Sequence, residues 1–107
     1  MAINSRAKGK RYELHIAKVL REHGFTAERG QQHAGGTDSP DVKHNLDGLH
    51  FECKHVENLN IWKALEQAEN DCGSKTPVVV FKRNRTKDYV ALSLEDFIAL
   101  YKEAKNV

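Results

Sequence analysis

The feature that most limits the possible folds is a continuous apolar run, Val78-Val79-Val80-Phe81, which Pro77 precedes. A strand with one exposed face alternates apolar and polar residues, whereas an unbroken β-branched run is typical of a strand buried on both faces. Such a strand needs helices that cover its sheet. The run therefore predicts an α/β fold in which this segment is a central strand.

Apolar periodicity predicts the other elements. Tyr12, Ile16 and Leu20 recur at helical spacing, which predicts a helix from Ser5 to His23 with Gly24 as its C-terminal cap. Ser93, with Asp96 three residues later, resembles a capping box that opens the last helix. The remaining predicted elements are strands at Phe25–Arg29, Asp41–Lys43, Leu49–His55 and Tyr89–Leu92, and a helix at Leu59–Asp71. The expected order is α-β-β-β-α-β-β-α, a mixed β-sheet flanked by helices.

Length and composition predict one soluble domain spanning residues 1–107. Hydrophobic residues make up 39% and charged residues 30%, as in ordinary folded proteins. No apolar run approaches the roughly 20 residues of a membrane helix, and no secretion signal is evident, so we expect a cytoplasmic protein without a membrane partner. Cys53 and Cys72 are too few and too far apart for a disulfide framework and are expected to be reduced.

Basic residues are clustered, although the net charge is only +2. One cluster comes before any acidic residue, and a second follows the apolar run. Such clusters suit a surface that contacts phosphates, but a solvated face explains them as often when nothing else supports binding. The first cluster consists of Arg6, Lys8, Lys10 and Arg11, and the second of Lys82, Arg83, Arg85 and Lys87.

The segment Leu49–His55 alternates, so that Glu52 and Lys54 share one face of the predicted strand. Asp41 begins the preceding strand, and Asn45-Leu46-Asp47-Gly48 predicts a tight hairpin turn between the two. A hairpin would bring two carboxylates and one ammonium group within a few ångströms. The segment from Gly30 to Pro40 is rich in turn residues and predicts a functional loop beside them.

Carboxylates gathered in this way suit phosphodiester hydrolysis. The reaction needs an activated water, neutralisation of charge on the phosphorane-like transition state and stabilisation of the leaving oxygen. A divalent metal ion meets these needs because it lowers the pKa of bound water and acts as a Lewis acid. Mg²⁺ prefers hard oxygen ligands and keeps several waters, so two or three carboxylates suffice.

The spacing of Pro40-Asp41 and Glu52-Cys53-Lys54, with ten residues between Asp41 and Glu52, resembles the PD-(D/E)XK nuclease pattern. The order of helices and strands around this motif also resembles the restriction-endonuclease-like fold of that superfamily. Within it, the chain is similar to the Holliday junction resolvases of archaea and some phages. The shared features are the basic N-terminus that runs into Gly9-Lys10-Arg11-Tyr12-Glu13, the loop that ends in Ser39-Pro40-Asp41, the Glu52-Cys53-Lys54 triplet and Gln67.

This resemblance implies a Mg²⁺-dependent endonuclease, with Mn²⁺ as a substitute. Glu13, Asp41, Glu52 and the Cys53 carbonyl oxygen would bind metal. Lys54 would orient or activate the water. The resemblance further implies a homodimer that cuts four-way DNA junctions in a bacterial, archaeal or phage-infected cell. Gln67 would support the site, Ser39 would touch DNA, and phosphates would be contacted by Arg6, Lys8, Lys10 and Arg11.

Several of these residues also have a simpler interpretation. Glu13 could be a solvated helix residue paired with a basic side chain, and Gln67 an ordinary helix residue. Asp38 competes with Asp41 for the metal role. Trp62 is expected in the core or at a dimer interface. A zinc site is disfavoured because the spacing fits no common ligand pattern; its candidate ligands would be Cys53, His33, His44, His50 and His55.

Two other functions remain open from the sequence. One is a nicking, repair or restriction-like nuclease with the same core but a different DNA substrate. The other is a DNA-binding module without catalytic activity. The intact set of Asp41, Glu52 and Lys54 argues against the second.

Overall fold

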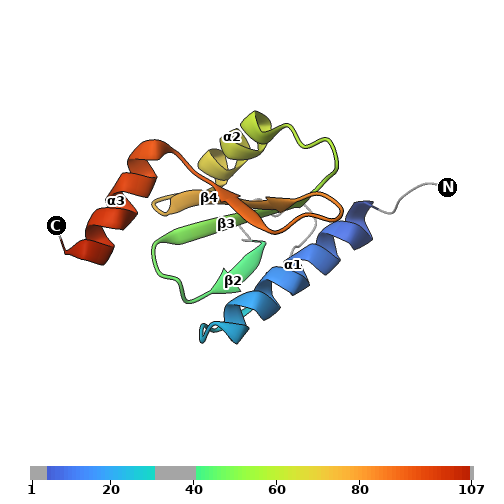
Figure 1. Cartoon of the computed structure of the whole chain (residues 1–107), viewed down its shortest axis with the longest axis horizontal. Helices are drawn as coiled ribbons and strands as arrows, with labels where there is room; N and C mark the ends of the chain where they lie inside the picture. Colours follow the sequence, from blue (N-terminus) through green and yellow to red (C-terminus); the bar gives the residue numbers. More distant parts are fainter. Residues whose placement is uncertain (1–4, 31–40, 107) are drawn as a thin grey trace.

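The computed structural model describes residues 5–30 and 41–106. Within these ranges the elements follow the predicted order, so the expected α/β fold is confirmed (Figure 1). No described helix is long and apolar enough to cross a membrane. The elements are α1 (Ser5–Glu22), β1 (Ala27–Arg29), β2 (Val42–His44), β3 (Leu49–His55), α2 (Ile61–Asp71), β4 (Thr76–Lys82), β5 (Tyr89–Ala91) and α3 (Leu94–Lys105).

The main sheet has three strands in the order β3-β4-β5. Strands β3 and β4 are parallel, from Leu49 opposite Thr76 to His55 opposite Lys82, whereas β4 and β5 are antiparallel. A parallel pair needs a long crossover connection, and α2 provides it. The prediction that the apolar run forms the central strand is confirmed, since β4 lies between two neighbours.

The predicted hairpin between β2 and β3 is wrong. Strand β2 pairs instead with β1 in a separate two-stranded antiparallel sheet, with Ala27 opposite His44. In the connecting turn, the Leu49 N–H donates to the Leu46 oxygen at 3.2 Å and Gly48 has a φ of 85°. Because Asp47 does not share the positive φ that a type I′ hairpin turn requires, the turn splays the two strands apart.

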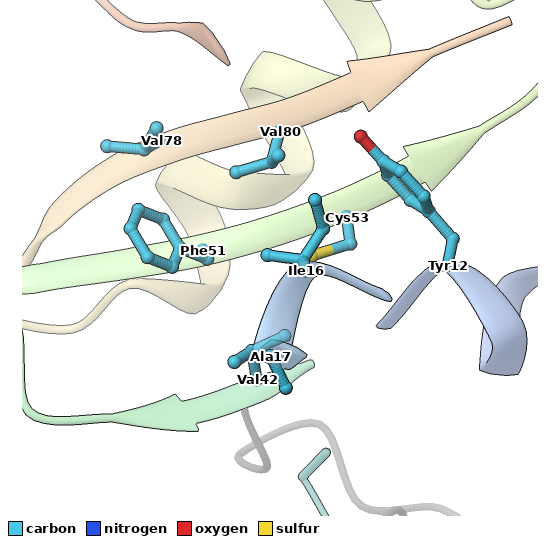
Figure 2. Packing of buried hydrophobic residues seen from close by; sticks show 8 residues of the cluster. All are labelled: Tyr12, Ile16, Ala17, Val42, Phe51, Cys53, Val78 and Val80. Atoms are coloured by element: carbon cyan, nitrogen blue, oxygen red, sulfur yellow. The ribbon is translucent and has the colours of Figure 1, made fainter. Parts of the chain in front are cut away.

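The main core lies between α1 and the sheet. Tyr12, Ile16 and Ala17 of α1 pack on buried side chains of β2, β3 and β4 (Figure 2). Those side chains are Val42, Phe51, Cys53, Val78 and Val80. Alternate residues of the apolar run therefore face α1, as period-two geometry requires.

A second, smaller core covers the opposite face of β4. There Val79 packs against Ala64 and Ala68 of α2, so the apolar run is buried on both faces. Small residues four apart let the helix approach the strand closely. Trp62 is 77% exposed, so of its two expected places the core is wrong, and a dimer interface stays a prediction. The helix begins at Ile61, because the Asn60 side chain accepts a hydrogen bond from the Lys63 N–H.

Helix α3 extends beyond the sheet (Figure 1). Its predicted N-cap is confirmed, because the Ser93 side chain accepts a hydrogen bond of 3.1 Å from the Asp96 N–H. None of its residues is buried, and Phe97, Ile98 and Tyr101 are 54%, 43% and 56% exposed. The helix is therefore capped but contributes little to the core.

We expect Val79→Ala to lower the free energy of unfolding by about 2 kcal/mol, because two buried methyl groups are lost and α2 cannot fully close the gap. Val90→Ala is the matched control, since Val90 is 59% exposed, and should change stability by at most about 0.5 kcal/mol. Urea denaturation measures both. Equal losses for the two variants would contradict the assignment of Val79 to the core.

Candidate active site

A pocket of about 570 Å³ lies where α1, the C-terminal half of β3 and α2 approach one another. It gathers every residue predicted for catalysis or metal binding, although these come from four separate segments of the chain. Among the lining residues are Glu13, Asp41, Glu52, Cys53, Lys54 and Gln67. The juxtaposition expected from the sequence therefore exists, even though the hairpin expected to create it does not.

Asp41 is the residue directly before β2, and its side chain reaches the site. Its Oδ2 accepts a hydrogen bond of 2.8 Å from the backbone N–H of Cys53. Strand β3 pairs with β4 along its other edge, so the side chain of Asp41 meets the edge that carries no ladder partner in the main sheet. Asp41 is 9% exposed. A side-chain contact thus replaces the strand pairing that a hairpin would have made.

Glu52 and Lys54 lie two residues apart on β3 and share a face, as predicted. The Lys54 Nζ is 3.6 Å from the Glu52 Oε2, and Glu52 is only 5% exposed. His50 lies on the same face, with its Nε2 at 3.8 Å from the Glu52 Oε1. That nitrogen is buried and has no hydrogen-bond partner among the described residues. The polar face of β3 is therefore largely covered, with an amine and an imidazole beside the carboxylate.

Glu13 enters the pocket from α1 and is 7% exposed. Its Oε1 accepts a hydrogen bond of 2.8 Å from the Arg29 Nε of β1. The simpler interpretation expected a basic partner, which is present, and a solvated carboxylate, which is wrong. The sequence does not reveal the role of Arg29, because a single arginine in a three-residue strand carries no motif.

Burial is the main reason why Asp41 and Glu13 have a raised pKa. Burial, followed by the negative charge of Glu52, raises the pKa of Asp41 to about 7, although the Cys53 N–H and Lys54 oppose the shift. Burial also raises the pKa of Glu13, and the Arg29 guanidinium acts in the opposite direction. Like charges in a poorly solvated site disfavour ionisation together. A divalent cation would relieve this repulsion.

The oxygen donors fit a hard divalent cation in type but do not yet converge on one point. Within residues 5–30 and 41–106, no three His, Cys, Asp or Glu side chains are arranged to hold a metal ion. Glu13 is engaged by Arg29, Asp41 by a backbone N–H, and Glu52 lies beside Lys54. Acidic side chains without a cation between them take basic partners and N–H donors instead. Binding a metal would require these carboxylates to exchange their present partners for the cation.

Cys53 can offer only its backbone to such a site. Its thiol packs in the main core, and burial raises its pKa well above the ordinary value. The thiolate that zinc prefers is therefore disfavoured. His44 contacts Phe51, and the His55 Nε2 lies 3.0 Å from the Asn84 Oδ1, so these rings are engaged elsewhere. His33 lies outside the described residues.

The predicted DNA-contacting residues of α1 lie in its first turns. Lys8 lines the pocket and its Nζ is 3.8 Å from a carboxylate oxygen of Glu57. Arg6, Lys10 and Arg11 are exposed and do not line it. Ser39 and the alternative ligand Asp38 lie outside the described residues, as do Pro40 and most of the predicted loop.

Comparison with known proteins identifies the family. Residues 4–107 match the family model described as "Phage putative PDDEXK endonuclease". The chain belongs to this family of PD-(D/E)XK endonucleases. In structure it is similar to Hjc, a Holliday junction resolvase from the archaeal hyperthermophile Archaeoglobus fulgidus, with a TM-score of 0.56 and 22% sequence identity. The match covers 79% of this chain and 72% of that one. No curated protein sequence matched the chain.

This likeness confirms the restriction-endonuclease-like fold. The family match confirms the resemblance to PD-(D/E)XK nucleases, because it spans nearly the whole chain. The roles of individual residues of this PD-(D/E)XK protein in metal binding, catalysis and DNA binding remain predictions.

The raised pKa of Asp41 predicts a pH-dependent stability. A carboxyl group whose pKa rises on folding stabilises the fold when protonated, and this contribution is lost as pH rises from the ordinary 3.8 to about 7. Without metal, Asp41→Asn should therefore melt at a higher temperature than wild type at about pH 8, and the difference should vanish near about pH 4.

The matched control is Asp47→Asn, because Asp47 is an exposed turn residue. Its effect should not depend on pH. Thermal unfolding in chelator, followed by circular dichroism, measures both variants. A melting temperature of Asp41→Asn that stays below the wild-type value at every pH would mean that the carboxylate is not strained in the pocket.

Proposed function

We propose that this protein is a metal-dependent endonuclease that hydrolyses phosphodiester bonds of branched DNA, with Mg²⁺ as the natural cofactor. The observation that carries the proposal is the single pocket shared by Glu13, Asp41, Glu52 and Lys54, three of them nearly buried acidic residues with an amine at 3.6 Å from one of them. Membership of an endonuclease family supports the same reaction class.

In this proposal Glu13, Asp41 and Glu52 hold the cation, and the Cys53 carbonyl oxygen is a further ligand. The cation supplies a water of lowered pKa and a Lewis acid at the phosphate. The chain's own residues do the rest. Lys54 donates hydrogen bonds to the water or to a phosphate oxygen, and Gln67 supports the site from α2. Arg29 holds the Glu13 carboxylate in the pocket and adds positive charge beside it.

The proposed substrate is a four-way DNA junction bound by a homodimer. Structural similarity to a Holliday junction resolvase supports this substrate class. The cationic start of α1 suits sequence-independent phosphate contacts. The exposed apolar residues of α3 and β5 suit burial against a second copy, because contiguous apolar surface is uncommon on monomers. Two sites related by symmetry would cut two strands.

Removal of one acidic ligand tests the reaction. Glu52→Gln should reduce cleavage of a synthetic four-way junction by about 100-fold or more, because the amide cannot supply the charge that holds the cation. Junction binding should be kept. Glu69→Gln is the matched control, since Glu69 is an exposed residue of α2 that does not line the pocket. Cleavage by Glu52→Gln at the wild-type rate would remove Glu52 from the site.

The substrate is tested by comparing DNA shapes. We expect cleavage of a four-way junction to exceed that of a flap or a linear duplex of the same sequence, and to require Mg²⁺ or Mn²⁺. Chelator should abolish it. Gel analysis of end-labelled strands measures all three substrates. Preference for flaps or linear duplex would favour a repair or restriction-like nuclease instead. Binding without cleavage in any metal would favour a DNA-binding module.

A further inference from the structure

A second cavity, of about 440 Å³, adjoins the candidate active site. The two cavities share Lys8 and His55 as lining residues, so they are neighbours on the molecule. The cavity lies between α1 and the ends of β3 and β4. Its polar lining consists of Lys8, Arg11, His15, His55, Lys82 and Asn84. Lys82 belongs to the second basic cluster of the sequence, whereas His15 and Asn84 were not predicted to lie in any site.

The lining is cationic. Lys8, Arg11 and Lys82 bring three permanent positive charges, and none of the lining residues is acidic. Two carboxylates of the described part of the chain contact groups that line the cavity. Glu57 contacts Lys8 at 3.8 Å, and Asp88 is held by groups of α1. The cations therefore outnumber the neighbouring carboxylates, and an anion would find several N–H donors within one hollow.

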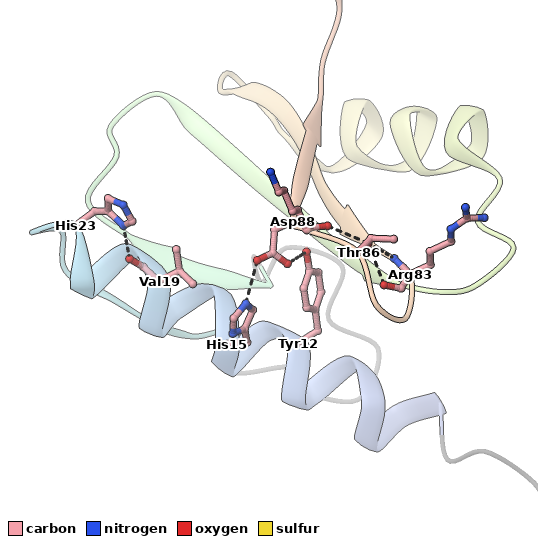
Figure 3. Close-up of polar contacts among 8 residues, drawn as sticks. Tyr12, His15, Val19, His23, Arg83, Thr86 and Asp88 are labelled. Carbon is pink, nitrogen blue, oxygen red and sulfur yellow. Dashed lines mark hydrogen bonds and ion pairs between the residues drawn. The ribbon is translucent and has the colours of Figure 1, made fainter.

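The walls of the cavity are held in place by a polar network (Figure 3). Asp88 accepts a hydrogen bond of 3.0 Å from the Tyr12 hydroxyl, and its other oxygen lies 3.0 Å from the His15 Nε2. These contacts fasten the segment after β4 to α1. The same segment is closed on itself, because the Thr86 Oγ1 accepts from the Arg83 N–H and donates to the Arg83 oxygen.

A further contact fixes the inner wall. The His55 Nε2 lies 3.0 Å from the Asn84 Oδ1. The His55 ring also contacts the Tyr12 ring in a tilted arrangement, with 5.5 Å between the ring centroids. Lys82 pairs with His55 in the parallel ladder, so the sheet fixes its backbone beside the pocket. These contacts join α1, β3 and β4, so the backbone segments that carry the cationic groups are held in fixed positions.

We propose that this cavity binds a backbone phosphate of the DNA, next to the phosphate that the active site cleaves. The inference rests on the proposed nuclease function and specifies the path of the strand, which would run from the acidic pocket past Lys8 and His55 to Lys82. Lys8, Arg11 and Lys82 supply the charged donors. Phosphate contacts of this kind set the register of a nucleic acid without reading its sequence.

Binding of a labelled four-way junction in chelator tests the proposal, because cleavage cannot then interfere. Lys82→Gln should weaken binding several-fold and lower the slope of log affinity against log salt by about 1, since one phosphate contact is lost. Lys82→Arg should keep both values. The control is Lys102→Gln, which makes the same charge change on an exposed position of α3 and should alter neither.

Fluorescence anisotropy over a range of salt concentrations gives both quantities, and circular dichroism reports folding. If Lys82→Gln does not fold, Arg11→Gln at an exposed helix position replaces it and should lower the slope equally. An unchanged affinity and slope would overturn the phosphate site. Wild-type protein that binds junctions but never cleaves them would overturn the nuclease proposal while leaving the phosphate site standing.

Discussion

The hydrogen bond from the Cys53 N–H to the Asp41 carboxylate is the contact on which the arrangement of the site depends. It joins the two-stranded β1–β2 sheet to the edge of β3, where no backbone ladder connects them. The same contact fixes an acidic side chain beside Glu52 on the adjacent strand. A buried backbone N–H costs free energy unless it is satisfied, so this link serves both the fold and the candidate chemistry.

The acidic side chains of the site repel one another, and nearby basic side chains offset part of this repulsion. Three acidic residues share one pocket, and burial raises the pKa of Asp41 and Glu13. Arg29 and Lys54 lie against two of the carboxylates and compensate part of their repulsion. Buried carboxylates that repel one another are expected at a cation-binding site. Functional sites retain interactions that are unfavourable until the ligand binds.

Local pattern predicted the elements well and their pairing less well. The burial of Val78, Val79 and Val80 followed from an unbroken apolar run, and the Ser93 cap from its spacing to Asp96. The hairpin was wrong because an Asp-Gly pair permits several turns, and only one of them keeps two strands in register. Trp62 is outside the core, the first of its two expected places, because its helix turns Ala64 and Ala68 to the sheet. Arg29 was missed because its partner, Glu13, is distant in sequence.

The sequence by itself determined the order of helices and strands, the buried central strand and the residue types of the candidate active site, because periodicity and spacing are local properties. Its motif also predicted the nuclease family that comparison confirmed. Only the tertiary structure decided how Asp41 meets β3, that Arg29 pairs with Glu13, and that Lys8, Arg11 and Lys82 line one cavity. Those facts depend on contacts between segments far apart in the chain, which packing selects and local pattern does not encode.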